Sequence, residues 1–194
     1  SGDLLWSVTP ADETNYDSDG DMLKSIKIVD NVLYTCGYAG YPDDDTRKDF
    51  DFYVEARNTN DGSLVWKKTY NDKKTYTDYA FDLAIDTDEG AIYVAGVTDY
   101  DYDPDEQKLI SDADWWIIKT NISNGEQITE SDWENGLIFG DEDNTENDAI
   151  KAIAMGNNSL FAVGSKGTTD IKSIPNISGT EDIEAKWWIK ELSK

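Results

Sequence analysis

A short apolar segment that ends in glycine occurs three times in the chain, and this repetition constrains the fold more than any other feature. The three copies are Leu33–Gly37, Ile92–Gly96 and Leu160–Gly164, spaced about 60 to 70 residues apart. A repeat of this length, built from strands, indicates a supersecondary unit that buries its faces only by packing against neighbouring copies. The sequence therefore predicts a repeat protein made of β-sheets.

Each unit contains four segments with strand character. Aromatic and β-branched residues dominate these segments, and both favour sheets. Besides the glycine-ended segment, there is one that ends near a tryptophan, one that starts with an acidic residue, and one rich in aromatics. In chain order the three tryptophan segments are Leu4–Val8, Leu64–Lys68 and Trp133–Phe139, the acid-led ones are Asp21–Ile26, Asp78–Ile85 and Asp148–Ile153, and the aromatic ones are Phe50–Val54, Asp114–Lys119 and Lys186–Lys190.

The last unit is split between the two ends of the sequence. Its glycine turn and tryptophan segment stand at the N-terminus, so the expected units are about 9–69, 70–136 and 137–194 completed by 1–8, in one domain of 194 residues. Adding a strand to an exposed sheet edge satisfies its backbone groups. If the strand comes from the same chain, it closes a ring; from another copy, it builds a ring or a filament. The predicted assembly strands contain Leu4, Leu5, Trp6 and Val8 at one end and Trp187, Trp188 and Ile189 at the other.

The pattern resembles the blades of β-propellers, in particular those of secreted bacterial and archaeal surface proteins and the related PQQ-like type. The resemblance rests on the acid-led strand, on Tyr93–Gly96, on the aromatic strand running into Lys119–Asn121, and on Asn58–Trp66. It implies an all-β array of three four-stranded antiparallel blades. Propellers have about four to eight blades, so a threefold trefoil or prism is the alternative. The resemblance implies no activity, because propellers host many functions.

Charge and composition narrow the function. The chain has 41 acidic and 17 basic residues, a net charge of −24, and no histidine. This charge disfavours nucleic acids and anionic membranes as partners, and no apolar run is long enough to span a bilayer. Without histidine, the commonest general base and zinc ligand are absent. We therefore expect a protein that is not an enzyme, does not bind nucleic acid and does not insert into a membrane.

Two acidic clusters are candidate calcium sites, because alternating carboxylates in a turn can surround a hard cation. The bland alternative is that aspartate holds the turn through its backbone hydrogen bonds or forms a solvated loop. The first cluster contains Asp17, Asp19 and Asp21, and the second contains Asp99, Asp101, Asp103 and Asp105.

The long loops after Gly37, Gly96 and Gly164 differ in length while the strands repeat, so specificity for a ligand would lie there. Tyr100 and Tyr102, interleaved with aspartates, are the candidate sugar-binding residues. Three Asn-x-Ser sequons favour an extracellular or cell-surface location. We expect a secreted structural protein that associates with itself and is stabilised by calcium. The alternative is a lectin-like propeller that binds glycans.

Overall fold

The computed structural model describes residues 2–8, 21–41, 49–71, 77–100, 102–103, 108–109, 113–129, 133, 135–140, 147–168 and 186–193. Within these residues, every element of regular secondary structure is a β-strand. The long strands form three antiparallel sheets, and two short strands form a separate pair. Sheet 1 contains β1 (Met22–Val29), β2 (Val32–Tyr41), β3 (Asp49–Asn58) and β4 (Leu64–Tyr70), in that order across the sheet. Sheet 2 contains β5 (Thr77–Asp86), β6 (Ala91–Tyr100), β9 (Asp114–Asn121) and β10 (Leu137–Phe139). Sheet 3 contains β11 (Asn147–Met155), β12 (Ser159–Thr168) and β13 (Lys186–Ser193).

The expected all-β class and the antiparallel sheets are confirmed. Each sheet is a meander in which consecutive main strands are hydrogen-bonded neighbours. A short pair, β7 (Tyr102–Asp103) and β8 (Lys108–Leu109), lies in the loop between β6 and β9. Sheet 3 has three strands among the described residues where four were expected, and the sheets do not close into a ring.

Two strand predictions differ from the structure. Residues 2–8 form no strand, and none of the described strands pairs with them, which a strand needs for its backbone hydrogen bonds. The last strand of sheet 2 begins at Leu137 rather than at Trp133. The Trp133 ring instead packs edge-on against Tyr93, with 5.4 Å between the ring centroids. This tryptophan is therefore used to cover the sheet rather than to extend it.

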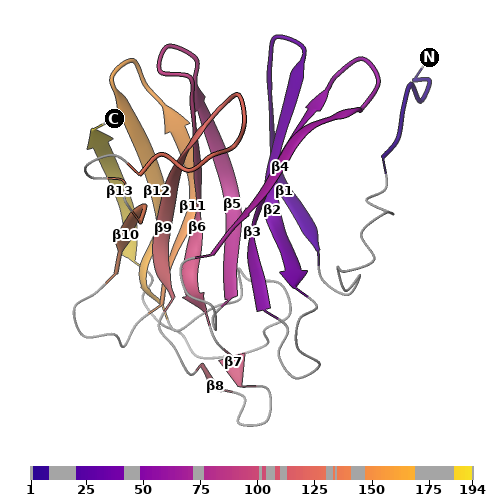
Figure 1. The fold of residues 1–194 in the computed structure, drawn as a ribbon. Coiled ribbons are helices and arrows are strands. Elements are labelled where there is room, and N and C mark those ends of the chain that lie inside the picture. The colour runs from indigo at the N-terminus through magenta and orange to yellow at the C-terminus, as the bar shows by residue number, and fades with distance from the viewer. Residues whose placement is uncertain are drawn as a thin grey trace.

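The three sheets lie face to face, and their cores lie between them (Figure 1). One buried cluster joins sheet 1 to sheet 2, and a second joins sheet 2 to sheet 3. Adjacent strand residues point to opposite faces, so Trp116 packs on Phe52 of sheet 1 at 4.5 Å between centroids while Trp115 enters the second cluster. A sheet that is covered on both faces needs this continuous run of apolar residues, which explains the paired tryptophans.

The carboxylate of Asp82, in β5, links the first strands of all three sheets. Its Oδ1 accepts a hydrogen bond from Ser25 Oγ of β1 at 2.6 Å, and its Oδ2 accepts one from the backbone N–H of Ile153 in β11 at 3.0 Å. The Lys27 ammonium lies 3.7 Å from the same carboxylate. Asp82 thereby holds the first strands of the three sheets, β1, β5 and β11, next to one another, and the remaining strands of each sheet extend away from them.

The repeated glycine has a steric cause. Opposite each of Gly37, Gly96 and Gly164, the first strand of the sheet contains a β-bulge, at Leu23/Ser25, Ala80/Asp82 and Ile150/Ala152. The bulge brings a carbonyl oxygen so close that a Cβ on the glycine would overlap it. Glycine permits this close backbone approach, so the marker that defines the repeat also maintains its bulge.

Candidate assembly interface

The glycines define equivalent positions in the three sheets. In each sheet the glycine lies opposite one aromatic residue of the third strand: Gly37 opposite Tyr53, Gly96 opposite Trp116, and Gly164 opposite Trp188. We call the side of a sheet that faces the preceding sheet its back face, and the side that faces the next sheet its front face. The back face of sheet 1 and the front face of sheet 3 are then the two end faces of the stack, and none of the described sheets covers either of them (Figure 1).

The end face of sheet 1 carries exposed apolar side chains on β1. Leu23, Ile26 and Ile28 are 52%, 56% and 60% exposed. The register places them at the same positions as three residues of β5 and three of β11. Those equivalents lie in the two interior clusters: Ala80, Leu83 and Ile85 in sheet 2, and Ile150, Ile153 and Met155 in sheet 3. The same repeat position is thus buried twice and exposed once.

The end face of sheet 3 shows the converse arrangement. Phe161, Val163 and Ile189 are exposed, with Ile189 reaching 78%. Val163 and Ile189 lie directly opposite each other on β12 and β13. Their equivalents in the other two sheets are all buried in the interior clusters: Tyr34, Cys36 and Val54 in sheet 1, and Tyr93, Ala95 and Ile117 in sheet 2. The end face of sheet 3 therefore exposes repeat positions that the other two sheets bury in the interior clusters.

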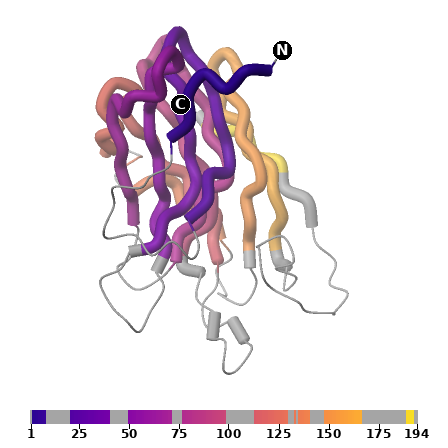
Figure 2. Tube along the Cα trace, turned by 90° about the vertical axis from the view of Figure 1, so that its right-hand side faces the viewer, coloured from indigo at the N-terminus to yellow at the C-terminus, as the bar shows by residue number. Residues whose placement is uncertain are grey.

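The N-terminal segment lies beside the end face of sheet 1, away from the other sheets (Figures 1 and 2). Its Trp6 Nε1 donates a hydrogen bond to the carbonyl of Thr59 at 2.9 Å, and the Trp6 ring lies against Gly62. A Cβ at Gly62 would come within 2.6 Å of that ring, and φ there is +73°. Both features require glycine. Trp6 is thus seated on the turn that joins β3 to β4.

Trp66 of β4 makes the same contacts one sheet further on. Its Nε1 donates to the carbonyl of Ile122 at 3.1 Å, and its ring lies against Gly125, where φ is +70°. Ile122 and Gly125 occupy the positions in sheet 2 that Thr59 and Gly62 occupy in sheet 1. Since Trp66 belongs to the fourth strand of the preceding sheet, Trp6 has the place of a fourth-strand tryptophan in a layer before sheet 1.

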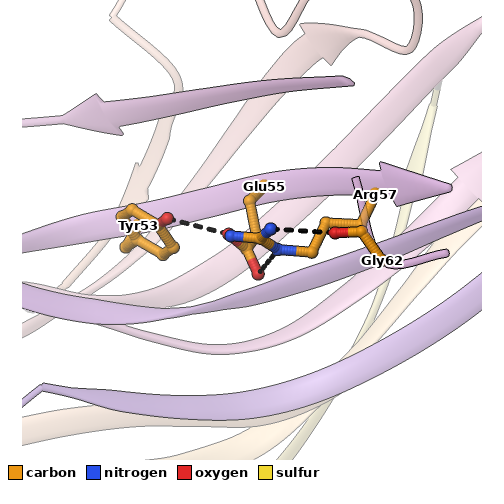
Figure 3. Close-up of polar contacts among 4 residues, drawn as sticks. All are labelled: Tyr53, Glu55, Arg57 and Gly62. Atoms are coloured by element: carbon orange, nitrogen blue, oxygen red, sulfur yellow. Dashed lines mark hydrogen bonds and ion pairs between the residues drawn. The ribbon is translucent and has the colours of Figure 1, made fainter. Parts of the chain in front are cut away.

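The polar half of the sheet 1 end face is centred on an ion pair (Figure 3). The Arg57 guanidinium donates two hydrogen bonds to the Glu55 carboxylate, at 2.9 and 2.8 Å, and Tyr53 Oη donates a third at 2.9 Å. The hydrogen bond to Glu55 is the main cause that raises the pKa of Arg57. In sheet 2 the equivalents of Glu55 and Arg57 are Ile118 and Thr120, so this pair is particular to the end face.

Arg57 also replaces a contact that the neighbouring sheet supplies elsewhere. Its third N–H group donates to the Gly62 carbonyl at 3.1 Å. The equivalent carbonyl in sheet 2, that of Gly125, accepts a hydrogen bond from the Tyr70 hydroxyl of β4 at 2.6 Å. Glu55 and Arg57 were not predicted from the sequence. The available signal was two opposite charges at alternate positions of a strand whose counterpart in the next unit is apolar.

The predicted assembly residues lie at the two ends of the stack. Leu4, Leu5 and Val8 are exposed beside sheet 1, and Trp6 is half-buried on its turn. Trp187, Trp188 and Ile189 lie in β13, paired with Ser165, Gly164 and Val163 of β12, and the side chains of the two tryptophans lie outside the described residues. The structure does not bring the two sets together within one chain; they lie on opposite flanks (Figure 1).

The candidate calcium and ligand residues lie largely outside the described part of the chain. Asp21 is described, and its Oδ1 accepts a hydrogen bond from the backbone N–H of Gly40 at 2.9 Å, which connects β1 to β2. Asp99 and Tyr100 end β6, and Tyr102 and Asp103 form β7, but their side chains lie outside the description, as do Asp17, Asp19, Asp101 and Asp105 entirely. Among the described residues, no three cysteine or carboxylate side chains gather as a metal site would require.

The only cysteine, Cys36, is fully buried between sheets 1 and 2. Burial raises the pKa of its thiol, so the reactive thiolate is disfavoured. Among the described residues, no helix is long and apolar enough to cross a membrane. Comparison with models of known protein families and with curated proteins finds no match to this chain.

Proposed function

We propose that the chain is a non-enzymatic structural protein, located outside the cell or on its surface, that associates with copies of itself. The N-terminal segment of one copy, Leu4 to Val8, adds to sheet 3 of another copy as its fourth strand. Calcium stiffens the acidic turns. With three sheets per chain, two copies would supply six, within the range of a β-propeller, and an open array of copies would form a filament.

One observation carries the proposal, which is the docking of Trp6. It repeats the docking of Trp66, which belongs to a fourth strand, down to the indole hydrogen bond and the glycine beneath the ring. A segment held in this way has the position of a fourth strand, and among the described strands none pairs with it. In the proposed assembly, its backbone pairs with a strand from another copy.

The second requirement is a sheet edge that can receive the segment. β13 pairs with β12 on one side, and the described residues place no strand on its other side. A sheet edge presents a row of donors and acceptors that template another strand. Adding a strand there uses main-chain hydrogen bonds for affinity and the Trp6 site for register.

The test is the mass of the complete chain in solution, measured by light scattering across a range of protein concentrations with millimolar calcium and again with a chelator. We expect a mass at least twice the 21.8 kDa of one chain, and a single-chain mass for a variant that lacks Ser1 to Val8. Calcium removal should weaken association or lower the melting temperature. A single-chain mass for the unmodified protein at all concentrations would contradict the proposal and favour the lectin-like alternative.

A matched variant tests the contribution of the Trp6 side chain separately from that of the backbone of the segment. Trp6→Ala removes the indole hydrogen bond and the ring over Gly62 while keeping the backbone that would pair with β13. We expect it to weaken association by roughly 10-fold or more, because an aromatic side chain that association buries contributes more than 1 kcal/mol to an interface. Ser7→Ala, which truncates an exposed polar side chain of the same segment and keeps Trp6, serves as the control.

A further inference from the structure

We propose that the exposed face of sheet 1 docks onto the exposed face of sheet 3 of a second copy, so that copies stack head to tail and rebuild the junction that joins sheets within one chain. This inference rests on the proposed self-association, and it adds which two faces meet and in which direction the copies stack. The partner is a second copy of this chain.

The two interior junctions follow one plan. In each, the back face of one sheet meets the front face of the sheet before it, and the back face presents apolar residues of the first two strands. In the first junction these are Leu83 and Ile92, and in the second they are their equivalents Ile153 and Leu160. The two junctions use different residues of similar apolar character at the same repeat positions. The arrangement therefore does not require one particular set of side chains.

The two end faces are the unmatched halves of a third such junction. Sheet 1 leaves a back face open, with Ile26 and Ile28 exposed, and sheet 3 leaves a front face open, with Val163 and Ile189 exposed. Joining two back faces or two front faces would not repeat the interior plan. Joining a back face to a front face does, and it is a heterologous contact that either closes into a ring or continues as a filament.

The N-terminal segment fits this arrangement. Trp6 holds it in the layer that precedes sheet 1 (Figure 2). Sheet 3 of the second copy would occupy the same layer, with β13 as the strand nearest the segment. Strand addition and face docking therefore require the same placement of the two copies, although they use different residues.

The charges on the sheet 1 end face are compatible with burial. Glu55 and Arg57 neutralise each other through two hydrogen bonds, and Tyr53 satisfies the carboxylate further. A paired and hydrogen-bonded charge costs far less to bury than an isolated one. The net charge of −24 opposes association between copies, and salt screens this repulsion. Measurements therefore belong at about 0.15 M salt or above.

The experiment uses two variants of the complete chain, Ile26→Asp on sheet 1 and Ile189→Asp on sheet 3. Each places an unpaired charge in the proposed junction, which should weaken association by about 100-fold or more. We expect each variant alone to have the mass of one chain by light scattering. An equimolar mixture should contain a species of twice that mass, because each variant retains the one intact face that the other lacks.

Two controls distinguish a loss of docking from misfolding of the variants and from general repulsion by the added charge. Both side chains are more than half exposed, so the thermal melting of the isolated variants should match that of the unmodified chain. Ile138→Asp, an exposed isoleucine on β10 of the middle sheet, adds the same charge away from both end faces and should leave association unchanged. Recovery in the mixture cannot arise from misfolded variants.

The outcomes separate this inference from the proposed function. If the unmodified chain associates and the deletion of Ser1 to Val8 abolishes association, but both aspartate variants still associate, the docking inference is wrong and strand addition stands. If the deletion has no effect while the variants complement each other, the docking inference stands without strand addition. If only one variant is impaired, or the mixture stays at the mass of one chain, head-to-tail docking is overturned.

Discussion

The junction between sheets 1 and 2 and the end face of sheet 1 present the same repeat positions in two environments. At the junction, Leu83 and Ile92 are fully buried; on the end face, their equivalents Ile26 and Leu33 are exposed and half-buried. The residue types hardly differ, so the sequence of the first two strands is suited to burial in both places. The end face therefore has the composition of a junction without its second half.

On the third strand, the residue types at the junction and on the end face differ. At the junction, Ile118 belongs to the apolar cluster and Thr120 is fully buried, whereas on the end face their equivalents are the Glu55–Arg57 pair. Arg57 also satisfies a turn carbonyl that Tyr70 satisfies for the next sheet. In this half, the polar groups of the end face are hydrogen-bonded within sheet 1. The comparison predicts large effects of substitution at the junction and small ones on the end face, except where association occurs.

The largest contrast should come from the two tryptophans. Trp66→Ala removes a buried ring and a hydrogen bond at the junction, and we expect it to lower the free energy of unfolding by about 3–5 kcal/mol. Trp6→Ala should lower it by about 1 kcal/mol or less at low protein concentration, because the ring is only half-buried. Urea denaturation at micromolar protein measures both. Equal losses would show that the N-terminal segment is part of the folded core.

A smaller contrast is expected between Leu83→Ala and Ile26→Ala. Leu83 is fully buried, so its truncation leaves a cavity and should lower the free energy of unfolding by about 2–5 kcal/mol. Ile26, at the same repeat position, is 56% exposed, and its truncation should change stability by less than about 0.5 kcal/mol.

Protein concentration sharpens this second comparison. If copies stack through the sheet 1 end face, association stabilises the folded state, and the cost of Ile26→Ala should grow as the protein is concentrated. The cost of Leu83→Ala should stay the same. Denaturation series at two concentrations, tenfold or more apart, measure this difference directly. A concentration-independent cost for Ile26→Ala would count against docking through that face.

The sheets themselves were predictable because aromatic and β-branched residues dominate the strand segments and the glycine marker repeats. The glycine-ended and aromatic segments lie within β2 and β3, β6 and β9, and β12 and β13, and these strands extend up to four residues past the expected ends. The bulge opposite each glycine was not predicted, since it depends on a carbonyl of the neighbouring strand. Pairing registers and close approaches of this kind are properties of two segments together, which neither segment shows alone.

The candidate interface was predictable in part. The split unit predicts Trp6 and β13 as matching ends, and this match stays a prediction. The expectation that Leu4–Val8 forms a strand was wrong, since none of the described strands pairs with it. The exposed isoleucines of β1 could not be recognised as an end face, since the same pattern is buried in β5 and β11. Exposure depends on which sheets are present and not on the local sequence.

Tyr70 and Arg57 allow a finer test, since each donates a hydrogen bond to the carbonyl of an equivalent glycine. Tyr70→Phe leaves the buried Gly125 carbonyl without its donor, and we expect a loss of about 1–3 kcal/mol in unfolding free energy. Arg57→Lys keeps the charge beside Glu55 but loses the forked hydrogen bonds, and about 1 kcal/mol is expected. Thermal melting at low protein concentration ranks the two. A larger loss for Arg57→Lys would mean that the end face is the more tightly organised region.

The smallest effect concerns pH and Asp51, a buried carboxyl on β3 of the end face. Burial raises the pKa of Asp51 from 3.8 to about 6, and the hydrogen bond from Asn71 Nδ2 at 2.7 Å opposes this. Between these two values the folded chain holds a proton that the unfolded chain has released, so stability should fall as the pH rises from about 4 to about 6.

Asp51→Asn removes this titration while keeping the shape of the side chain. We expect it to flatten that part of the stability profile, with a gain of about 1 kcal/mol at pH 7 after allowing for solvent screening. Asp61→Asn is the matched control, because hydrogen bonds from Ser63 lower the pKa of this exposed carboxyl and removal of the charge there should bring no such gain. Urea denaturation from pH 4 to pH 7 gives both profiles. If copies stack on this face, the Asp51 slope should also steepen with protein concentration, because docking would bury the carboxyl more deeply, whereas an unchanged slope would indicate that the polar half of the end face stays in water.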